Sequence, residues 1–198
     1  MLFKKAFTLA EVLIAMTIIG VVAALTVPNL MADTSSSALR TKFKATYVQF
    51  QNGLIHAENV QKHAFVDVGV AGTNNAKYNI DQFMNHHFKA KRINRAEGPA
   101  GITYELKSGA QIIFPQATQT IMTNTGCDNS HPCTLYIDVN GRQGPNEIVE
   151  CTSGTTDGNN ILTACTVDAN VITDIFPIQV RKSQVLPKTN AVNYILNN

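Results

Sequence analysis

An apolar run of 21 residues, Phe7 to Val27, is the feature that most constrains how this chain can fold. As a helix the run is roughly 31 Å long at about 1.5 Å per residue, which matches the thickness of a bilayer core. Lys4 and Lys5 precede it, and positive charge at this place predicts a cytoplasmic N-terminus. One carboxylate, Glu11, lies inside the run. An acid in a membrane segment costs about 2.5–3.5 kcal/mol, so Glu11 needs a compensating partner.

Three interpretations of this segment compete. A secretory signal is cut after its apolar run, but the candidate site at Leu30–Ala32 lacks the small first residue that such a site needs. A permanent anchor explains the length of the run and leaves its acid unexplained. A cut between Ala6 and Phe7 creates a positive amine on Phe7, which can neutralise Glu11 of a neighbouring copy. Such a buried charge pair sets the register between identical helices, because a misaligned copy leaves both charges unpaired.

The stretch K-K-A-F-T-L-A-E-V-L-I resembles the prepilin signature of type IV pilins and of the pseudopilins of type II secretion. The resemblance implies that a leader, residues 1–6, is removed by a prepilin peptidase and that Phe7 is then N-methylated. It assigns assembly to Glu11 and also covers Gly20 and Pro28, between which filaments of this family often lose helical hydrogen bonds.

The resemblance further implies a structural subunit without enzymatic activity, which assembles with copies of itself and with other pilin-like subunits into a pilus or a pseudopilus. Before assembly it would be a single-pass inner-membrane protein whose head is periplasmic or extracellular. Two alternatives stay open. One is a minor pilin that binds DNA for uptake, and the other is a membrane-anchored or secreted protein with a different head function.

Residues 28–60 are predicted to continue the first helix. Five apolar residues recur there at spacings of three or four, which is typical of one face of an amphipathic helix: Leu39, Phe43, Tyr47, Phe50 and Leu54. We expect this stripe to pack on a globular head. A separate helix after a loop at Pro28–Ser37 is the alternative.

Residues 61–198 are predicted to form that head, with a disulfide-bonded α+β fold in which an antiparallel sheet lies on the long helix. The predicted strands are a hairpin over Gly101–Phe114 that turns at Ser108-Gly109, then Thr134–Val139, Thr173–Val180 and Val185–Leu186. The predicted helical patches are Asp81–Arg95 and Asn190–Leu196.

Four cysteines all lie in the C-terminal half: Cys127, Cys133, Cys151 and Cys165. Their spacing does not form the C-x2-C pairs of a zinc site. An even number of cysteines after a membrane-entry segment indicates two disulfides in an oxidising compartment. Three pairings are compatible with the sequence, and we favour the local one, which joins the first cysteine to the second and the third to the fourth.

Two features of the head are candidate ligand sites. The loop D-V-N-G, Asp138–Gly141, is similar to the start of a calcium loop, but it lacks the third oxygen ligand and the glutamate of that pattern. We expect a plain turn and no metal. The adjacent His86 and His87 diverge on a helix, so they are not expected to share a metal.

The second feature is a basic stretch from His86 to Arg95, whose candidate nucleic-acid contacts are Lys89, Lys91, Arg92 and Arg95. It contains a single aromatic residue, which offers little for base stacking. Lys4 and Lys5 account for the net charge of +2, so the chain without its leader is neutral and has no global basic field. We expect a solvated helix face or a subunit contact.

No motif for a catalytic nucleophile or a phosphate loop is present, and no cofactor is expected.

Overall fold

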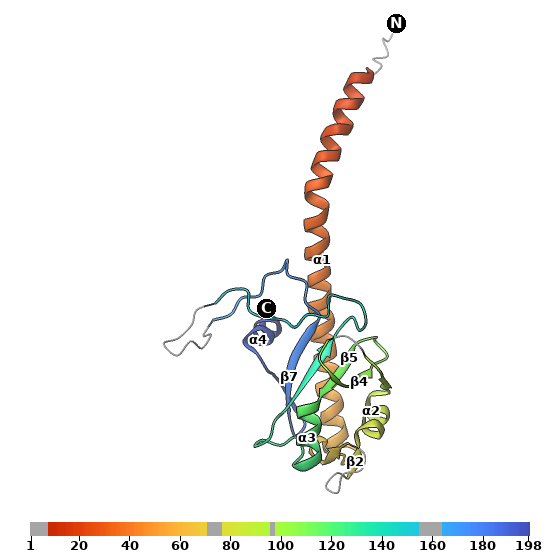
Figure 1. Cartoon of the computed structure of the whole chain (residues 1–198), viewed down its shortest axis with the longest axis vertical. Helices are drawn as coiled ribbons and strands as arrows, with labels where there is room; N and C mark the ends of the chain where they lie inside the picture. Colours follow the sequence, from red (N-terminus) through yellow and green to blue (C-terminus); the bar gives the residue numbers. More distant parts are fainter. Residues whose placement is uncertain (1–7, 71–76, 96–97, 155–163) are drawn as a thin grey trace.

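The computed structural model of the protein describes residues 8–70, 77–95, 98–154 and 164–198, and for residues 25–34 the backbone alone. One helix, α1 (Leu9–Asn59), runs for 51 residues and dominates the shape (Figure 1). Its N-terminal half projects away from a head that contains the other elements. Because α1 continues through residues 28–37, the alternative of a separate helix after a loop is wrong.

The projecting half of α1 does not pack on the head. Every side chain from residue 8 to residue 24 is exposed, including Leu9 at 81% and Ile19 at 67%. Within the described part of the chain, no helix combines the length and the apolarity needed to cross a membrane. The membrane span predicted for residues 7–27 stays a prediction.

The C-terminal half of α1 packs on the head through the predicted apolar stripe. Phe43, Phe50 and Leu54 are fully buried, and Leu39 is 7% exposed. The ring of Phe43 stacks on Phe176, with centroids 4.2 Å apart. Burying such a side chain stabilises the fold by about 1.5–3 kcal/mol. The sequence periodicity therefore identified the face of α1 that holds the head.

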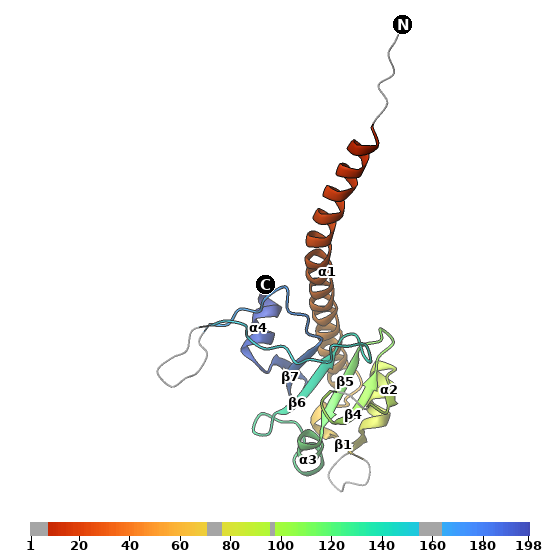
Figure 2. The same cartoon turned by 45° about the horizontal axis from the view of Figure 1, so that its top comes forward.

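A six-stranded antiparallel sheet forms the centre of the head, and its strands are neighbours in chain order (Figure 2). The strands are β3 (Lys91–Ile93), β4 (Gly101–Glu105), β5 (Gln111–Pro115), β6 (Cys133–Asp138), β7 (Ile175–Arg181) and β8 (Gln184–Pro187). A separate parallel pair consists of β1 (Val68–Gly69) and β2 (Tyr78–Asn79), which follow the short 3-10 helix η1 (Phe65–Asp67). The predicted α+β fold, with a long helix on an antiparallel sheet, is confirmed.

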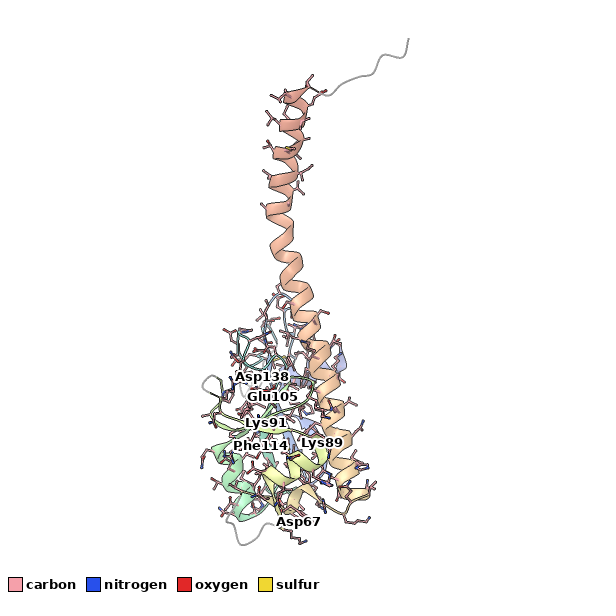
Figure 3. All side chains as sticks on the ribbon, turned by 90° about the vertical axis from the view of Figure 1, so that its right-hand side faces the viewer. Asp67, Lys89, Lys91, Glu105, Phe114 and Asp138 are labelled. Atoms are coloured by element: carbon pink, nitrogen blue, oxygen red, sulfur yellow. A yellow bond between two sulfur atoms is a disulfide. The ribbon has the colours of Figure 1, made fainter. Side chains whose placement is uncertain are left out.

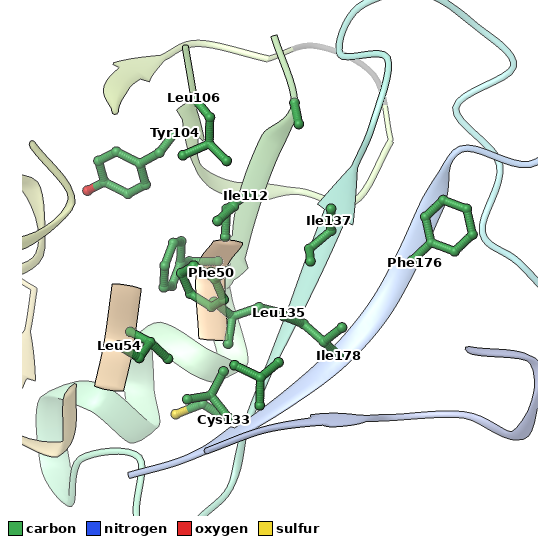
Figure 4. Close-up of a cluster of buried hydrophobic side chains, with 14 of the residues drawn as sticks. Phe50, Leu54, Tyr104, Leu106, Ile112, Cys133, Leu135, Ile137, Phe176 and Ile178 are labelled. Atoms are coloured by element: carbon green, nitrogen blue, oxygen red, sulfur yellow. The ribbon is translucent and has the colours of Figure 1, made fainter. Parts of the chain in front are cut away.

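Three short helices complete the head: α2 (Ile80–Phe88), α3 (Gln116–Asn124) and α4 (Asn190–Asn197). The core lies between α1 and the sheet. Figure 4 shows Phe50 and Leu54 of α1 beside Leu135 of β6, and Ile178 of β7 next to Leu135. All four side chains are fully buried.

The predicted strands and the C-terminal helix are confirmed to within a few residues, whereas the helical patch at Asp81–Arg95 is wrong beyond Phe88. Lys89 takes a left-handed conformation, with φ 53°, and ends α2. Lys91–Ile93 then pairs with Thr103–Glu105 as an edge strand. α3 was not predicted, because its sequence is polar and buries only Thr118 and Met122.

Two disulfides join Cys127 to Cys133 and Cys151 to Cys165, the local pairing favoured from the sequence. The first disulfide joins the segment before β6 to the first residue of that strand and is fully buried. The second lies in the long connection between β6 and β7, near a bridge between Ser153 and Thr166. Both therefore fasten irregular segments beside the central strands.

Candidate assembly site

Glu11 lies in the first turn of α1, where its carboxylate caps the helix. Its Oε2 accepts a hydrogen bond from the Thr8 backbone N–H at 2.9 Å and one from the Thr8 hydroxyl at 3.0 Å. The Glu11 N–H donates in return to Thr8 Oγ1 at 3.3 Å. This reciprocal arrangement is a capping box, which satisfies N–H groups that a helix N-terminus leaves without partners.

The capping box leaves part of the carboxylate available. Among the residues that the structure describes, only Thr8 donates to Glu11, and it uses only Oε2. The side chain is exposed, so Oε1 is accessible to a partner. The sequence-based interpretation assigned Glu11 a role and missed Thr8, although T-L-A-E fits the S/T-x-x-E pattern of a capping box.

An apolar surface surrounds and follows Glu11. Its exposed members include Leu9, Val12, Leu13, Ile14, Met16, Ile18, Ile19, Val21 and Val22. Gly20 lies among them, and a Cβ added to it would meet no atom within 4 Å. The absence of a side chain at Gly20 therefore gives no packing advantage within the described part of one chain.

The other residues assigned to processing and assembly are not placed by this structure. Ala6 and Phe7 lie outside the described residues, and so does the side chain of Pro28. The backbone of α1 is helical through both Gly20 and Pro28.

A comparison with protein families connects this segment to known proteins. The family profile described as "Prokaryotic N-terminal methylation motif" matches residues 1–27, which include Phe7, Glu11 and Gly20. The chain carries the N-terminal signature of type IV pilins and pseudopilins. That motif indicates a pilin-like substrate of a prepilin peptidase with a structural role. No curated protein and no solved structure matches the chain.

The basic stretch of the head is divided between different environments. Lys89 and Lys91 are exposed and lie on one side of the head (Figure 3). Arg92 forms an ion pair with Asp81, with 3.3 Å between Nη1 and Oδ2. The side chain of Arg95 is buried, with only 4% of it exposed. The four cations therefore do not form one exposed patch.

Arg95 lies instead in a buried polar network. Its guanidinium forms an ion pair with Asp138, whose side chain is fully buried, and it donates to Gln111 Oε1 at 2.7 Å. It also donates to Asn146 Oδ1. Burial raises the pKa of the Asp138 carboxyl, and the guanidinium and the N–H of Gly141 oppose that rise. The network satisfies a charge pair that would otherwise be costly to bury.

The D-V-N-G loop folds around the same carboxylate. Asp138 Oδ1 accepts hydrogen bonds from the backbone N–H groups of Asn140 at 3.1 Å and Gly141 at 2.8 Å. Gly141 has φ +71°, a conformation that glycine adopts readily. Within the described residues, no group of three or more histidine, cysteine or acidic side chains is arranged to hold a metal ion. The loop is a turn whose aspartate is paired with an arginine.

Proposed function

We propose that this protein is a structural subunit that assembles, after removal of residues 1–6 and methylation of Phe7, into a type IV pilus or pseudopilus filament. In this proposal the apolar half of α1 forms the filament core and the head faces outward. Neighbouring subunits are copies of this chain or other pilin-like chains.

The observation that carries the proposal is the exposed apolar surface on the projecting half of α1. Soluble monomeric proteins rarely expose a continuous apolar patch of more than a few hundred Å². Here every side chain from residue 8 to residue 24 is exposed, while the head buries most of its large apolar side chains. The methylation motif at residues 1–27 supports a pilin-like explanation of this surface.

Before assembly, the same surface would hold the precursor in the inner membrane. Lys4 and Lys5 favour a cytoplasmic N-terminus, so the head would lie on the far side. The two disulfides suit an oxidising compartment there.

Glu11 is proposed to fix the axial position of the neighbouring subunit by forming an ion pair with it. Its Oε2 stays in the capping box with Thr8. Its Oε1 accepts a hydrogen bond from the methylated N-terminal amine of Phe7 of the next subunit. A subunit in the wrong register would leave an amine and a carboxylate unpaired in an apolar core. Removing one partner of a buried ion pair costs about 3–5 kcal/mol, which is enough to select one register.

The test must separate the charge of Glu11 from its capping role. Glu11→Gln keeps the capping box, because glutamine also serves at this position, and it removes the charge. Thr8→Ala removes the cap, at a cost of about 1 kcal/mol, and keeps the charge. We expect Glu11→Gln to insert into the membrane normally and to abolish filaments counted by electron microscopy, whereas Thr8→Ala retains them.

Glu58→Gln, at the head end of the same helix, is the matched control and should form filaments at the normal level. Mass spectrometry of the membrane-associated wild-type chain should find an N-terminal Phe7 with one added methyl group. Normal filaments from Glu11→Gln alone would overturn the charge-pairing role. A mature chain beginning after residue 23 would overturn the proposed function itself.

A further inference from the structure

Histidines gather where the C-terminal ends of α1 and α2 meet. The chain has five histidines, and four of them lie in this region: His56 in the last turn of α1, His63 just after α1, and His86 and His87 in the last turn of α2. The ring centroids of His63 and His87 are 5.3 Å apart, and those of His86 and His87 are 4.8 Å apart. We call these four residues the histidine cluster.

Two hydrogen bonds of the cluster tie α2 to the segment that follows α1. His63 Nδ1 lies 3.2 Å from His87 Nε2, and His86 Nε2 lies 2.9 Å from Gln61 Oε1. The segment is itself folded back on α1, because the His63 N–H donates to the Ala57 carbonyl at 2.8 Å. The cluster thus links two helices that are otherwise joined by apolar packing.

The bond between His63 and His87 depends on the number of protons that the pair holds. One of the two facing nitrogens must donate a hydrogen, and the other must accept it with an unprotonated lone pair. If both rings are fully protonated, two N–H groups of two cations point at each other. The contact therefore tolerates at most one positive charge.

The surroundings of His87 also oppose its protonation. Its ring packs on Phe83, with centroids 4.5 Å apart. The charged groups that act on it are all bases: His86 and Lys89 on α2, His56 on α1 and His63 in the following segment. No carboxylate from the described residues acts on it. Burial, followed by these bases, lowers the pKa of His87 from its ordinary 6.5 to about 4, although the C-terminal end of α2 favours a cation.

We propose that the histidine cluster is an acid-sensitive latch that holds α2 against the end of α1 at neutral pH and releases it on acidification. When the latch opens, His87 regains its ordinary pKa and binds a proton that the closed state excludes. The open state binds more protons between pH 6.5 and about 4, so the stability of the closed state is complete above that window and falls as the pH drops through it.

Hydrogen exchange of the full chain in detergent micelles, followed by mass spectrometry at pH 7.0 and pH 5.0, tests the latch. After correction for the intrinsic pH dependence of exchange, we expect amides of α2 to open on the order of tenfold more often at pH 5.0. Amides of the central strands should show no such change. Equal opening of α2 at both pH values would overturn the proposal.

Three variants assign the effect. Glutamine can still form a hydrogen bond at either position but does not titrate. His87→Gln should therefore remove most of the acid-induced opening of α2, whereas His63→Gln should reduce it by less, because the burial of His87 remains. His131→Gln is the matched control, because His131 pairs with Asp128 outside the cluster and should keep the full effect. An NMR titration of the wild-type imidazoles adds a readout that needs no variant. A His87 that titrates at its ordinary value would overturn the latch, as would wild-type acid sensitivity in both cluster variants.

Discussion

The guanidinium of Arg95 is held by oxygen atoms from separate parts of the chain. Gln111 comes from β5, Asp138 from the end of β6, and Asn146 from the connection that follows. Asp174 extends the network, since its carboxylate accepts from the Asn146 N–H at 2.9 Å. A single side chain therefore neutralises the loop carboxylate and fixes the course of the chain around it.

Arg95→Ala should be among the most destabilising single substitutions in the head. It leaves the Asp138 carboxylate buried without its cation, and the loss of one partner of a buried pair costs about 3–5 kcal/mol. Lys91→Ala, four residues earlier on an exposed side chain, should change the free energy of unfolding by less than about 0.5 kcal/mol. Chemical denaturation of the two variants measures both values, and an equal loss in both would contradict the structural role of Arg95.

Sequence reasoning could single out Glu11 as a candidate assembly residue because the conflict between its charge and its apolar surroundings is local. It could not identify the role of Arg95, whose partner Asp138 is 43 residues away. The link from His63 to His87 was missed for the same reason, since their contact depends on how two helix ends meet. His86 and His87 were expected to diverge on their helix, but their ring centroids lie 4.8 Å apart, and His63 reaches them from elsewhere in the chain.

At the scale of elements, α1 and α2 meet at a site where only glycine fits. A Cβ added to Gly53 would lie 2.2 Å from Cε1 of Phe88, in the last turn of α2. Phe88 also packs on Phe50, with ring centroids 5.0 Å apart. The missing side chain at Gly53 thus lets the two helices approach each other.

Gly53→Ala should destabilise the head even though alanine favours a helix. Overpacking costs about 1–3 kcal/mol, which outweighs a gain in helix propensity of up to about 1 kcal/mol. Gly20→Ala on the same helix is the control, because its Cβ meets nothing within 4 Å and it gains the propensity alone. Thermal unfolding followed by circular dichroism should show a midpoint below that of the wild type for Gly53→Ala and no decrease for Gly20→Ala. A lower midpoint for Gly20→Ala than for Gly53→Ala would refute the close approach.

The elements predicted from the sequence are those whose own residues show a hydrophobic periodicity or a turn pattern. The stripe from Leu39 to Leu54 has helical periodicity, and the hairpin turn has a glycine, Gly109, at φ +82°. The strand at Lys91–Ile93 has no alternation of its own and exists because Thr103–Glu105 offers it an edge. α3 is polar and owes its position to the strands on either side of it.

At the scale of the whole molecule, the head should be stable without the projecting half of α1. The side chains of residues 8–24 are exposed, whereas Ser36, among the side chains that the structure describes, contacts the head through a hydrogen bond from its hydroxyl to the Val171 carbonyl at 3.4 Å. A chain that lacks residues 1–24 should therefore unfold at the same temperature as the full chain in the same detergent. Calorimetry compares the two, and a clearly lower midpoint for the shorter chain would show that the projecting half supports the head.

The attachment of α1 to the head has a mechanical consequence for the proposed filament. If the chain assembles as proposed, a pull along the filament axis would reach the head through the C-terminal half of α1. Tyr47 and Gln51 tie that half to the β7–β8 region: the Tyr47 hydroxyl donates to the Val185 carbonyl at 2.7 Å, and Gln51 donates to the Ser183 carbonyl at 2.9 Å. Because these two hydrogen bonds are spaced along the helix, a force along the helix axis acts on both of them at once, in shear. The head would then resist extraction as one body and would not peel open strand by strand.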